Sequence, residues 1–270
     1  MPSDPSLPAV AAFAGLGGQR VWSLMVSLFG DLAQGEGDAI DGPVLSAIMG
    51  ALDVRPEASR VALHRLRNDG WLQSHKIGRI SQHSLTAQGR AESAAASPRI
   101  YAAPPDLSEP WQMMVTEENG RETDSALRGA GFIAALPRAY VGRADSAVPK
   151  GCLALPGTPP PDWLRRAVEP AELEADYAAL LAALSTLDAE LPDADRLSAL
   201  DVAVLRCLIV HNWRRLVLKH PALPGGLIRP EWPGYRCHLL VDRLLRRYPR
   251  PALQDLATAC PGAKPPLSHA

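Results

Sequence analysis

The sequence predicts a mixed α+β chain of more than one domain, whose N-terminal part is a winged helix-turn-helix. The first observation is length, because 270 residues exceed the roughly 100–200 that form a single domain. The second is a series of three amphipathic helical segments and a hairpin between residues 20 and 98. The third is a change of pattern, since strand segments follow residue 99 and helical segments return from residue 172.

The first three helices are indicated by apolar spacing and by the residues at their ends. Over residues 21–33, apolar side chains recur at i, i+3, i+4 and i+7. Pro43 is suited to the first turn of a second helix over 43–52. A third helix is expected over 56–68, and Gly70 supplies the left-handed residue that stops it.

A hairpin and a fourth helix follow. Residues 71–75 and 80–85 have the composition of two strands around the tip Lys76-Ile77-Gly78-Arg79. Thr86 is suited to cap a fourth helix that extends to about residue 97. The order of three helices, strand, tip and strand is that of a winged helix.

Beyond residue 99 we expect a small α+β module and then an all-α C-terminal domain. Strands are expected at 111–116, 139–142 and 152–155, with a helix at 124–130. Helical patterns follow from Glu172, over 197–218 and near 244–248. The chain therefore divides into 1–19 (flexible arm), 20–98 (winged helix-turn-helix), 99–158 (α+β module), 159–255 (helical domain) and 256–270 (Pro-rich tail).

Charge is distributed unevenly along a chain that is neutral overall. The 28 basic residues nearly balance the 29 acidic ones. Residues 55–90 nevertheless hold seven Arg or Lys against Glu57 and Asp69, about +5. A local positive patch is typical of a domain that meets a polyanion such as DNA. The alternative is an ordinary solvated charged face.

The third helix and the hairpin tip supply the candidate DNA-binding residues. A helical wheel places Ala58, Val61, Ala62 and Leu66 on an apolar side, and Glu57, Arg60, His64 and Arg67 opposite. Since early residues of a recognition helix meet base edges, the first choices for base contact are Arg55, Ser59, Arg60 and His64.

Three further basic residues have other expected roles. Lys76 and Arg79 flank the tip and are expected to touch phosphate or the minor groove, unless they are only solvent charges. Arg65 falls on the inward side of the wheel, which favours an ion pair with an acid of the first helix.

No catalytic, metal or cofactor motif is visible, so we expect neither an enzyme nor a cofactor. Phosphate-binding glycine loops and a Ser/His/Asp arrangement are absent from the sequence. The four cysteines, Cys152, Cys207, Cys237 and Cys260, lack zinc spacing and are expected to be reduced. Neither an export signal nor a membrane span is recognisable, which favours the cytoplasm.

Several separated segments resemble the PaaX-type family of repressors of phenylacetic acid degradation. The N-terminal ones are 23–31, Arg65-Leu66 leading to Gly70-Trp71-Leu72, 85–90 (LTAQGR) and Arg99-Ile100-Tyr101. Those in the middle are Gly131-Phe132 and Tyr140-Val141. The C-terminal ones are His211-x-Trp213-Arg214-Arg215, His220-Pro221-x-Leu223-Pro224 and Glu231-Trp232-Pro233-Gly234.

This resemblance implies more than the residue patterns do. It implies a winged-helix domain, a ferredoxin-like middle module over 99–158, and an effector and dimerisation role for 159–255. It also implies a homodimer that binds double-stranded operator DNA and is released by an aryl-CoA thioester, typically phenylacetyl-CoA. The segment 111–155 is short for a complete four-stranded ferredoxin-like module.

The candidate effector-binding residues are Trp213, Arg214, Arg215 and Trp232. Arginines pair with the phosphates of coenzyme A, and aromatic faces pack against an adenine or aryl ring. The alternative for the tryptophans is a purely structural role. Two other functions stay open: an enzyme acting on nucleic acid or CoA esters, and a module that binds DNA without sensing a ligand.

Overall fold

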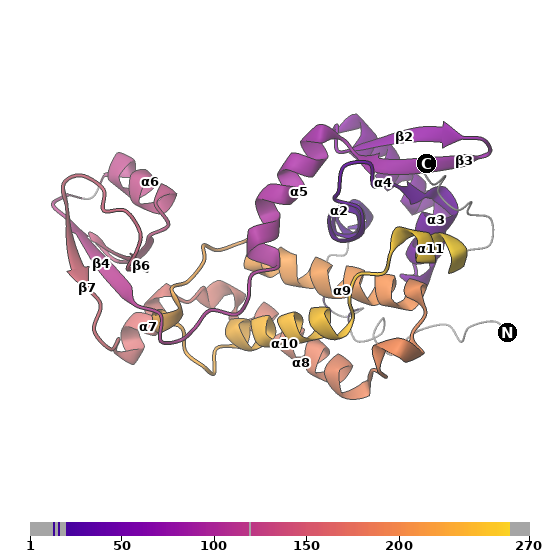
Figure 1. The fold of residues 1–270 in the computed structure, drawn as a ribbon. Coiled ribbons are helices and arrows are strands. Elements are labelled where there is room, and N and C mark those ends of the chain that lie inside the picture. The colour runs from indigo at the N-terminus through magenta and orange to yellow at the C-terminus, as the bar shows by residue number, and fades with distance from the viewer. Residues whose placement is uncertain (1–12, 14–15, 17–19, 119, 260–270) are drawn as a thin grey trace. The chain divides into compact units, whose positions relative to one another are not determined.

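The computed structural model describes residues 13, 16, 20–118 and 120–259 (Figure 1). The chain is mixed α+β, as predicted, with many helices and two small antiparallel sheets. The expected flexible arm, 1–19, lies outside the described residues apart from Phe13 and Leu16, and so does the last part of the Pro-rich tail, 260–270.

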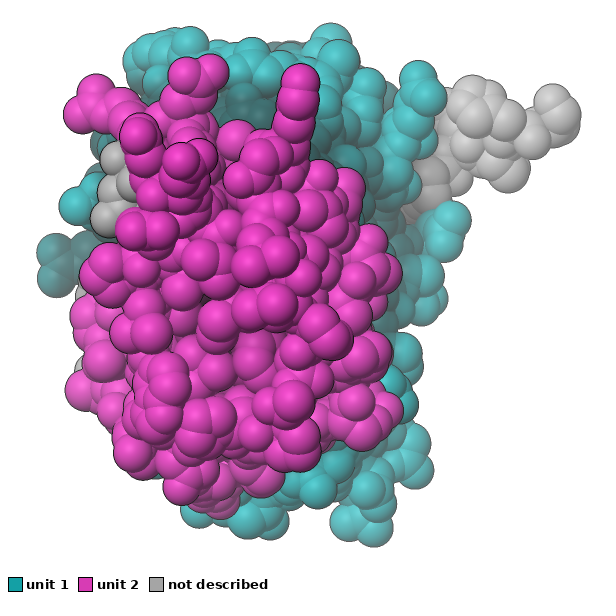
Figure 2. Space-filling model, turned by 90° about the vertical axis from the view of Figure 1, so that its left-hand side faces the viewer, with its two compact units in different colours: residues 1–102, 182–215, 240–270 teal, residues 103–181, 216–239 magenta. Residues whose placement is uncertain are grey.

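Two compact units divide the chain, and Figure 2 colours them separately. Unit 1 consists of residues 1–102, 182–215 and 240–270, and unit 2 of residues 103–181 and 216–239. Each unit gathers segments that are distant in the sequence. The domains predicted from the sequence are instead continuous stretches of the chain, and their boundaries stay predictions.

The N-terminal helices of unit 1 are α2 (Val21–Leu32), α3 (Gly42–Ala51) and α4 (Pro56–Asn68). Their predicted bounds are confirmed to within a few residues, with proline in the first turn of both α3 and α4. Helix α2 buries a wide apolar stripe, whereas α4 buries only Ala62 and Leu66. The broad remaining surface of α4 faces solvent. Gly70, with φ +74°, follows the end of α4 as expected.

A three-stranded sheet follows α4. It contains β1 (Ile40–Asp41), β2 (Leu72–Ile77) and β3 (Ile80–Leu85) in the order β1-β3-β2. The predicted hairpin is confirmed, with Leu72 opposite Leu85 and Ile77 opposite Ile80. Its two-residue tip uses Gly78 at φ +63°, a conformation that glycine adopts without a steric cost. The sequence pattern does not predict β1, because two residues are too few to show alternation.

Helix α5 (Ala87–Ile100) leaves the hairpin as the cap at Thr86 predicts. The Thr86 hydroxyl accepts a hydrogen bond from the backbone N–H of Gly89 at 3.0 Å. A Cβ at Gly89 would lie 2.3 Å from the carbonyl oxygen of Trp71. Only glycine therefore lets the start of α5 pack against the segment that enters β2.

The rest of unit 1 is helical. It contains most of α9 (Ala199–Val217), the later residues of α8 (Glu174–Glu190) and α10 (Pro233–Arg247), the short turn η2 (Ala194–Arg196), and α11 (Leu253–Ala259). Residues 202–210 of α9 are all buried. The helix predicted near 244–248 begins earlier, at Pro233, and α11 extends from the end of the predicted helical domain into the expected Pro-rich tail.

Unit 2 contains a four-stranded antiparallel sheet of order β5-β6-β4-β7. Its strands are β4 (Trp111–Thr116), β5 (Ile133–Leu136), β6 (Ala139–Arg143) and β7 (Cys152–Pro156). Met114, Leu127, Phe132 and Tyr140 form its core. Strand β5 was not predicted, so the sheet has one strand more than the sequence pattern indicated.

One helix connects two strands of this sheet, and short helices follow it in the chain. Helix α6 (Arg121–Gly129) connects β4 to β5, whereas residues 144–151 between β6 and β7 form turns. The short helices α7 (Asp162–Val168), η1 (Ala171–Leu173) and η3 (Gly225–Leu227) complete the unit with the first residues of α8 and α10.

Candidate functional site

The outward face of α4 carries most of the residues predicted to bind DNA. Arg55, Arg60, His64 and Arg67 are exposed, and Ser59 is half-buried. The Oγ atom of Ser59 is itself buried and has no hydrogen-bond partner within the described part of the chain. The structure therefore brings these five residues together on and beside one helix, with four long side chains in solvent.

Two residues of α4 differ from the helical-wheel prediction. Val61 was placed on the apolar side, yet 69% of it is exposed. Arg65 was expected to point inward and pair with an acid of the first helix. It is exposed instead, pairs with Asp69 at 3.4 Å, and lies over the ring of Trp22 on α2 at 4.8 Å. Because α4 buries only a narrow stripe, its solvent-facing surface is wider than the wheel indicated.

Most of the basic groups on this surface are not engaged by acids. Arg60 pairs with Glu57 at 3.2 Å, and both side chains are 73% exposed. Such exposed pairs contribute about 0–1 kcal/mol to stability and are readily exchanged. Over residues 20–118 and 120–259, no ion pair involves Arg55, Arg67 or the tip residues. These cations are therefore available to a polyanion.

The hairpin tip extends the basic surface beyond α4. Lys76, Ile77, Gly78 and Arg79 are all exposed, and Ile77 is 54% exposed despite its apolar side chain. The hairpin is held below its tip by His83, whose Nδ1 lies 2.8 Å from the hydroxyl of Ser74. Burial, followed by the charge of Arg67, lowers the pKa of His83, so this ring is neutral near pH 7.

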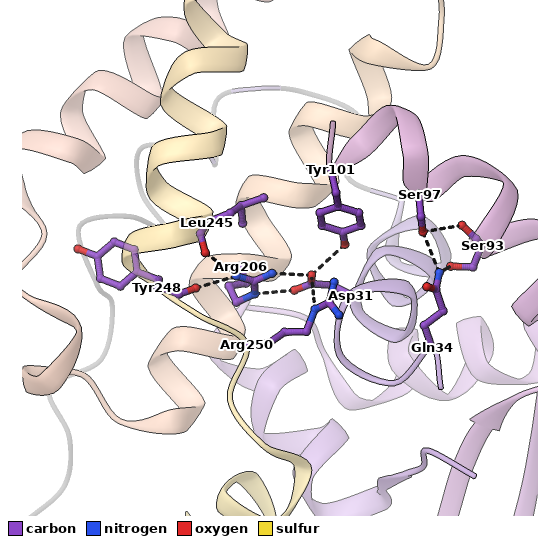
Figure 3. Close-up of polar contacts among 9 residues, drawn as sticks. All are labelled: Asp31, Gln34, Ser93, Ser97, Tyr101, Arg206, Leu245, Tyr248 and Arg250. Carbon is purple, nitrogen blue, oxygen red and sulfur yellow. Dashed lines mark hydrogen bonds and ion pairs between the residues drawn. The ribbon is translucent and has the colours of Figure 1, made fainter. Parts of the chain in front are cut away.

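A buried ion pair connects helices of unit 1 that are distant in sequence (Figure 3). Asp31 of α2 accepts two hydrogen bonds from Arg206 of α9, both at 2.8 Å. The side chains are 0% and 5% exposed, respectively. Nη1 of Arg206 also donates to the carbonyl oxygens of Leu245 and Tyr248, at 3.1 and 2.7 Å. The guanidinium is therefore well satisfied, as a buried cation must be.

Two further groups complete the surroundings of Asp31. The Tyr101 hydroxyl donates to its carboxylate at 2.8 Å, and Nε of Arg250 donates at 3.2 Å. Burial and the Asp31 carboxylate raise the pKa of Tyr101 well above its usual value. Nearby, Nε2 of Gln34 donates to the hydroxyls of Ser93 and Ser97 on α5, at 2.8 and 2.9 Å (Figure 3).

The Asp31–Arg206 pair was not predicted from the sequence, although a signal exists. Asp31 stands within the apolar spacing of α2, and Arg206 interrupts the apolar run 202–210. A charge on a buried face requires a partner of opposite charge. The sequence indicates that each residue needs such a partner, but not that the two pair with each other.

The four residues predicted to bind an effector have different surroundings. Trp213 is buried, and its Nε1 donates to the carbonyl oxygen of Ile100 at 3.0 Å. Nη1 of Arg215 donates to the carbonyl oxygen of Leu16 at 3.4 Å. Trp232 belongs to unit 2, where its ring lies 5.3 Å from that of Tyr177. These contacts fit the structural alternative considered for the tryptophans.

Arg214 is the member of this set that reaches a cavity. Its Nη1 donates to the hydroxyl of Ser27 at 3.1 Å. A cavity of about 140 Å³ lies among α2, α5 and α9 of unit 1, and Arg214, Ser27 and Trp71 are among its lining residues. Burial of its guanidinium lowers the pKa of Arg214.

Ser27 also orders the neighbouring histidine. Its hydroxyl donates to the carbonyl oxygen of Ser23 at 3.0 Å, so it accepts from Arg214 and from Nδ1 of His211, which is 3.1 Å away. Burial, followed by the charges of Arg214 and Arg215, lowers the pKa of His211 to about 3. His211 is therefore neutral, with its proton on Nδ1.

The described residues contain no group of three or more His, Cys, Asp or Glu side chains placed to hold a metal ion. Cys152, Cys207 and Cys237 are free thiols, and Cys260 lies outside the described residues. None of the helices described is long and apolar enough to cross a membrane.

Comparison with known protein families finds that two segments of this chain match family models. "PaaX-like protein" matches residues 20–89, and "PaaX-like protein C-terminal domain" matches residues 169–258. The first segment contains α4 and the hairpin, and the second contains α9 and α10. The matches thus cover both the basic surface and the helices that hold Arg206 and Arg214.

Individual proteins give a similar result. The "Transcriptional repressor PaaX" of Escherichia coli (strain K12) is 28% identical over 259 residues, covering 86% of this chain and 81% of that protein. A solved structure, an uncharacterized protein from Mycobacterium tuberculosis, has a TM-score of 0.44 and 17% identity, covering 87% of this chain and 98% of that one. That likeness is too remote to support an argument. The two family matches and the relative aligned along most of the sequence establish that the chain belongs to the PaaX-like protein family.

Proposed function

We propose that this protein is a transcriptional regulator that binds double-stranded operator DNA through residues 20–98, folded as a winged helix-turn-helix. The observation that carries the proposal is the exposed basic surface formed by α4 and the β2–β3 tip. A relative named as a transcriptional repressor supports regulation, and specifically repression.

The arrangement of elements supports the winged-helix assignment. Helices α3 and α4 are joined by the short turn 52–55, in which Asp53 adopts φ +57°. Strand β1 lies between α2 and α3 in the chain and pairs with β3 of the hairpin. In such a motif the second helix enters the major groove and the hairpin contacts the flanking backbone.

We propose different roles for the exposed cations according to their position. Arg55 at the N-cap and Arg60 lie in the first part of α4, where a recognition helix reaches base edges, and His64 follows one turn after Arg60 on the same exposed side. Arginine reads guanine with two hydrogen bonds, whereas Lys76 and Arg79 at the tip meet phosphate or the minor groove. Ser59 and Arg67 complete the proposed contact set.

The finer assignments outside residues 20–98 are also proposals. The sheet of unit 2 has the strand order of a ferredoxin-like module, and it would be an abridged one because turns replace the second crossover helix. A two-fold homodimer suits a palindromic operator. Light scattering tests the dimer, since a mass of 28.9 kDa that persists on operator DNA contradicts it.

An acidic aromatic effector that releases the DNA is the remaining part of the proposal. Residues Trp213, Arg214, Arg215 and Trp232 are the predicted contacts, and an aryl-CoA thioester is the effector that the family resemblance implies. A regulator in the cytoplasm fits this role.

Fluorescence anisotropy with promoter DNA from beside its own gene tests the central proposal. We expect the wild type to bind this DNA much more tightly than a scrambled duplex at physiological salt. The double variant Arg60→Ala/Arg67→Ala should lose that preference. Arg121→Ala/Arg166→Ala, which removes two exposed arginines of unit 2, is the charge-matched control and should keep it. Equal binding of both duplexes by folded wild type contradicts the proposal.

A further inference from the structure

The cavity of unit 1 has the size of a small ring. Its volume is about 140 Å³, and Val26, Trp71, Ile100 and Val210 supply apolar walls. An engineered apolar cavity of roughly 150 Å³ holds a benzene molecule. The space among α2, α5 and α9 therefore has about the volume that one six-membered ring needs, and it is too small for the nucleotide part of coenzyme A.

Its polar groups select the charge of the occupant. Arg214 lines the cavity, and no ion pair involves it within the described residues. Its Nη1 atom donates hydrogen bonds to the Ser27 hydroxyl at 3.1 Å and to the Ser23 carbonyl oxygen at 3.5 Å. A guanidinium has five N–H donors, so it retains donors for a planar anion.

The acids nearby do not neutralise Arg214. The carboxylate of Asp31 is occupied by Arg206, Arg250 and the Tyr101 hydroxyl. Glu92 also lines the cavity, but it is exposed and forms no ion pair with Arg214 within the described residues. A half-buried cation beside an apolar space thus lacks a counter-ion, and one carboxylate would supply both charge and hydrogen-bond acceptors.

We infer that this cavity binds a free one-ring aryl monocarboxylate of about the size of benzoate. The ring lies against the apolar walls, and the carboxylate pairs with Arg214. A thioester presents no carboxylate, so this ligand class differs from the aryl-CoA implied by the resemblance. Trp71 and α5 flank the β2–β3 hairpin, so an occupant there affects the DNA-binding surface; this regulatory consequence rests on the proposed function.

Calorimetry on the full chain with benzoate and its neutral analogue benzamide tests the ligand class. We expect benzoate to bind at least about tenfold more tightly than benzamide, because a hydrogen bond to a charged group is worth more than a neutral one. Arg214→Gln should remove that preference. Equal affinity for the two compounds, or no benzoate binding by folded wild type, overturns the inference.

A second pair of variants tests the location without altering any charge. Ala96 lines the cavity, and Ala96→Leu fills part of it. Ala95 is its exposed neighbour on α5, so Ala95→Leu is the matched control. The affinity for benzoate should fall at least tenfold in Ala96→Leu and stay unchanged in Ala95→Leu. If a folded Ala96→Leu protein keeps its affinity for benzoate, the ligand binds outside this cavity and the proposed site is wrong.

Promoter-DNA anisotropy with and without benzoate separates this inference from the proposed function. Failure of the ligand-free protein to bind promoter DNA contradicts the proposed function and leaves the benzoate titration as the test of the cavity. Normal DNA binding without any benzoate binding contradicts the cavity assignment alone. Benzoate binding that leaves DNA affinity unchanged supports the ligand site and overturns its regulatory role.

Discussion

Arginines serve opposite purposes in two regions of unit 1. Arg60 on α4 has a side chain that is 73% exposed, and its ion-pair partner among the described residues is Glu57 on the same helix. Arg206 on α9 is 5% exposed and bonds to Asp31 and to two backbone carbonyls. An exposed charge contributes little to folding and remains available to a partner, whereas a buried charge is costly unless its surroundings match it. The same residue type is thus free for binding in one region and committed to packing in the other.

The largest effect is expected from breaking the buried pair. Asp31→Asn keeps the side-chain volume but leaves Arg206 and Arg250 without their shared carboxylate. We expect a loss of about 3–5 kcal/mol in the free energy of unfolding, because the buried cation is then uncompensated. Urea denaturation followed by circular dichroism measures this loss.

Glu57→Gln is the exposed counterpart, since it removes the partner of Arg60. Its free energy of unfolding should change by no more than about 0.5 kcal/mol. The comparison fails if the two acid-to-amide variants destabilise the protein equally.

A smaller effect, on DNA affinity and not on stability, is expected from the exposed region. Arg60→Ala should weaken operator binding by about 1–3 kcal/mol and relax base preference, because this arginine faces outward from the recognition helix. Glu57→Ala is the control, since it releases Arg60 from its ion pair and should not weaken binding. Anisotropy with single-base operator variants measures both properties. An Arg60→Ala protein with unchanged affinity and base preference removes this residue from the reading set.

Buried His211 should make folding stability depend on pH. Its pKa is lowered to about 3 in the folded protein, from 6.5 when solvated. Above pH 6.5 both states are neutral and the full stability is present. As the pH falls, the unfolded chain binds a proton that the folded chain excludes, so stability is lost. Between pH 7.5 and 5.5 we expect a loss of about 1.4 kcal/mol from this residue.

Chemical denaturation at the two pH values compares wild type with His211→Gln, which has no ring to titrate. The wild type should lose about 1.4 kcal/mol more than the variant over this interval. Parallel losses in both proteins would show that His211 does not stay neutral in the folded state.

The contrast between the two regions also explains what the sequence could predict. The helix 56–68, the hairpin and the Thr86 cap depend on local spacing and turn residues, and all three agree with the structure. The Asp31–Arg206 pair joins residues 175 positions apart, and local patterns carry no information on which distant charges meet. The exposure of Val61 depends on how little of α4 is covered by its neighbours, which a wheel cannot show.

Candidate binding residues follow the same division. The exposed cations of α4 and the tip could be proposed from charge and order, because a surface role requires no tertiary partner. The sequence could not show which of the candidate effector residues share a site. Trp213 and Trp232 are buried in separate units, whereas Arg214 lines a cavity. Aromatic and basic residues that are close in sequence need not serve one site.

The smallest effect is expected at the hairpin tip, where Arg79 is exposed and makes no ion pair in the described part of the chain. Arg79→Ala should weaken binding to promoter DNA and to scrambled DNA to a similar extent, because a phosphate contact carries no sequence information. The plot of log binding constant against log salt concentration should become shallower by about 0.9, the contribution of one phosphate contact on duplex DNA. Arg166→Ala, which removes an exposed arginine of unit 2, should leave that slope unchanged. A loss confined to promoter DNA would instead make Arg79 a base-reading residue and would extend direct readout from α4 to the tip.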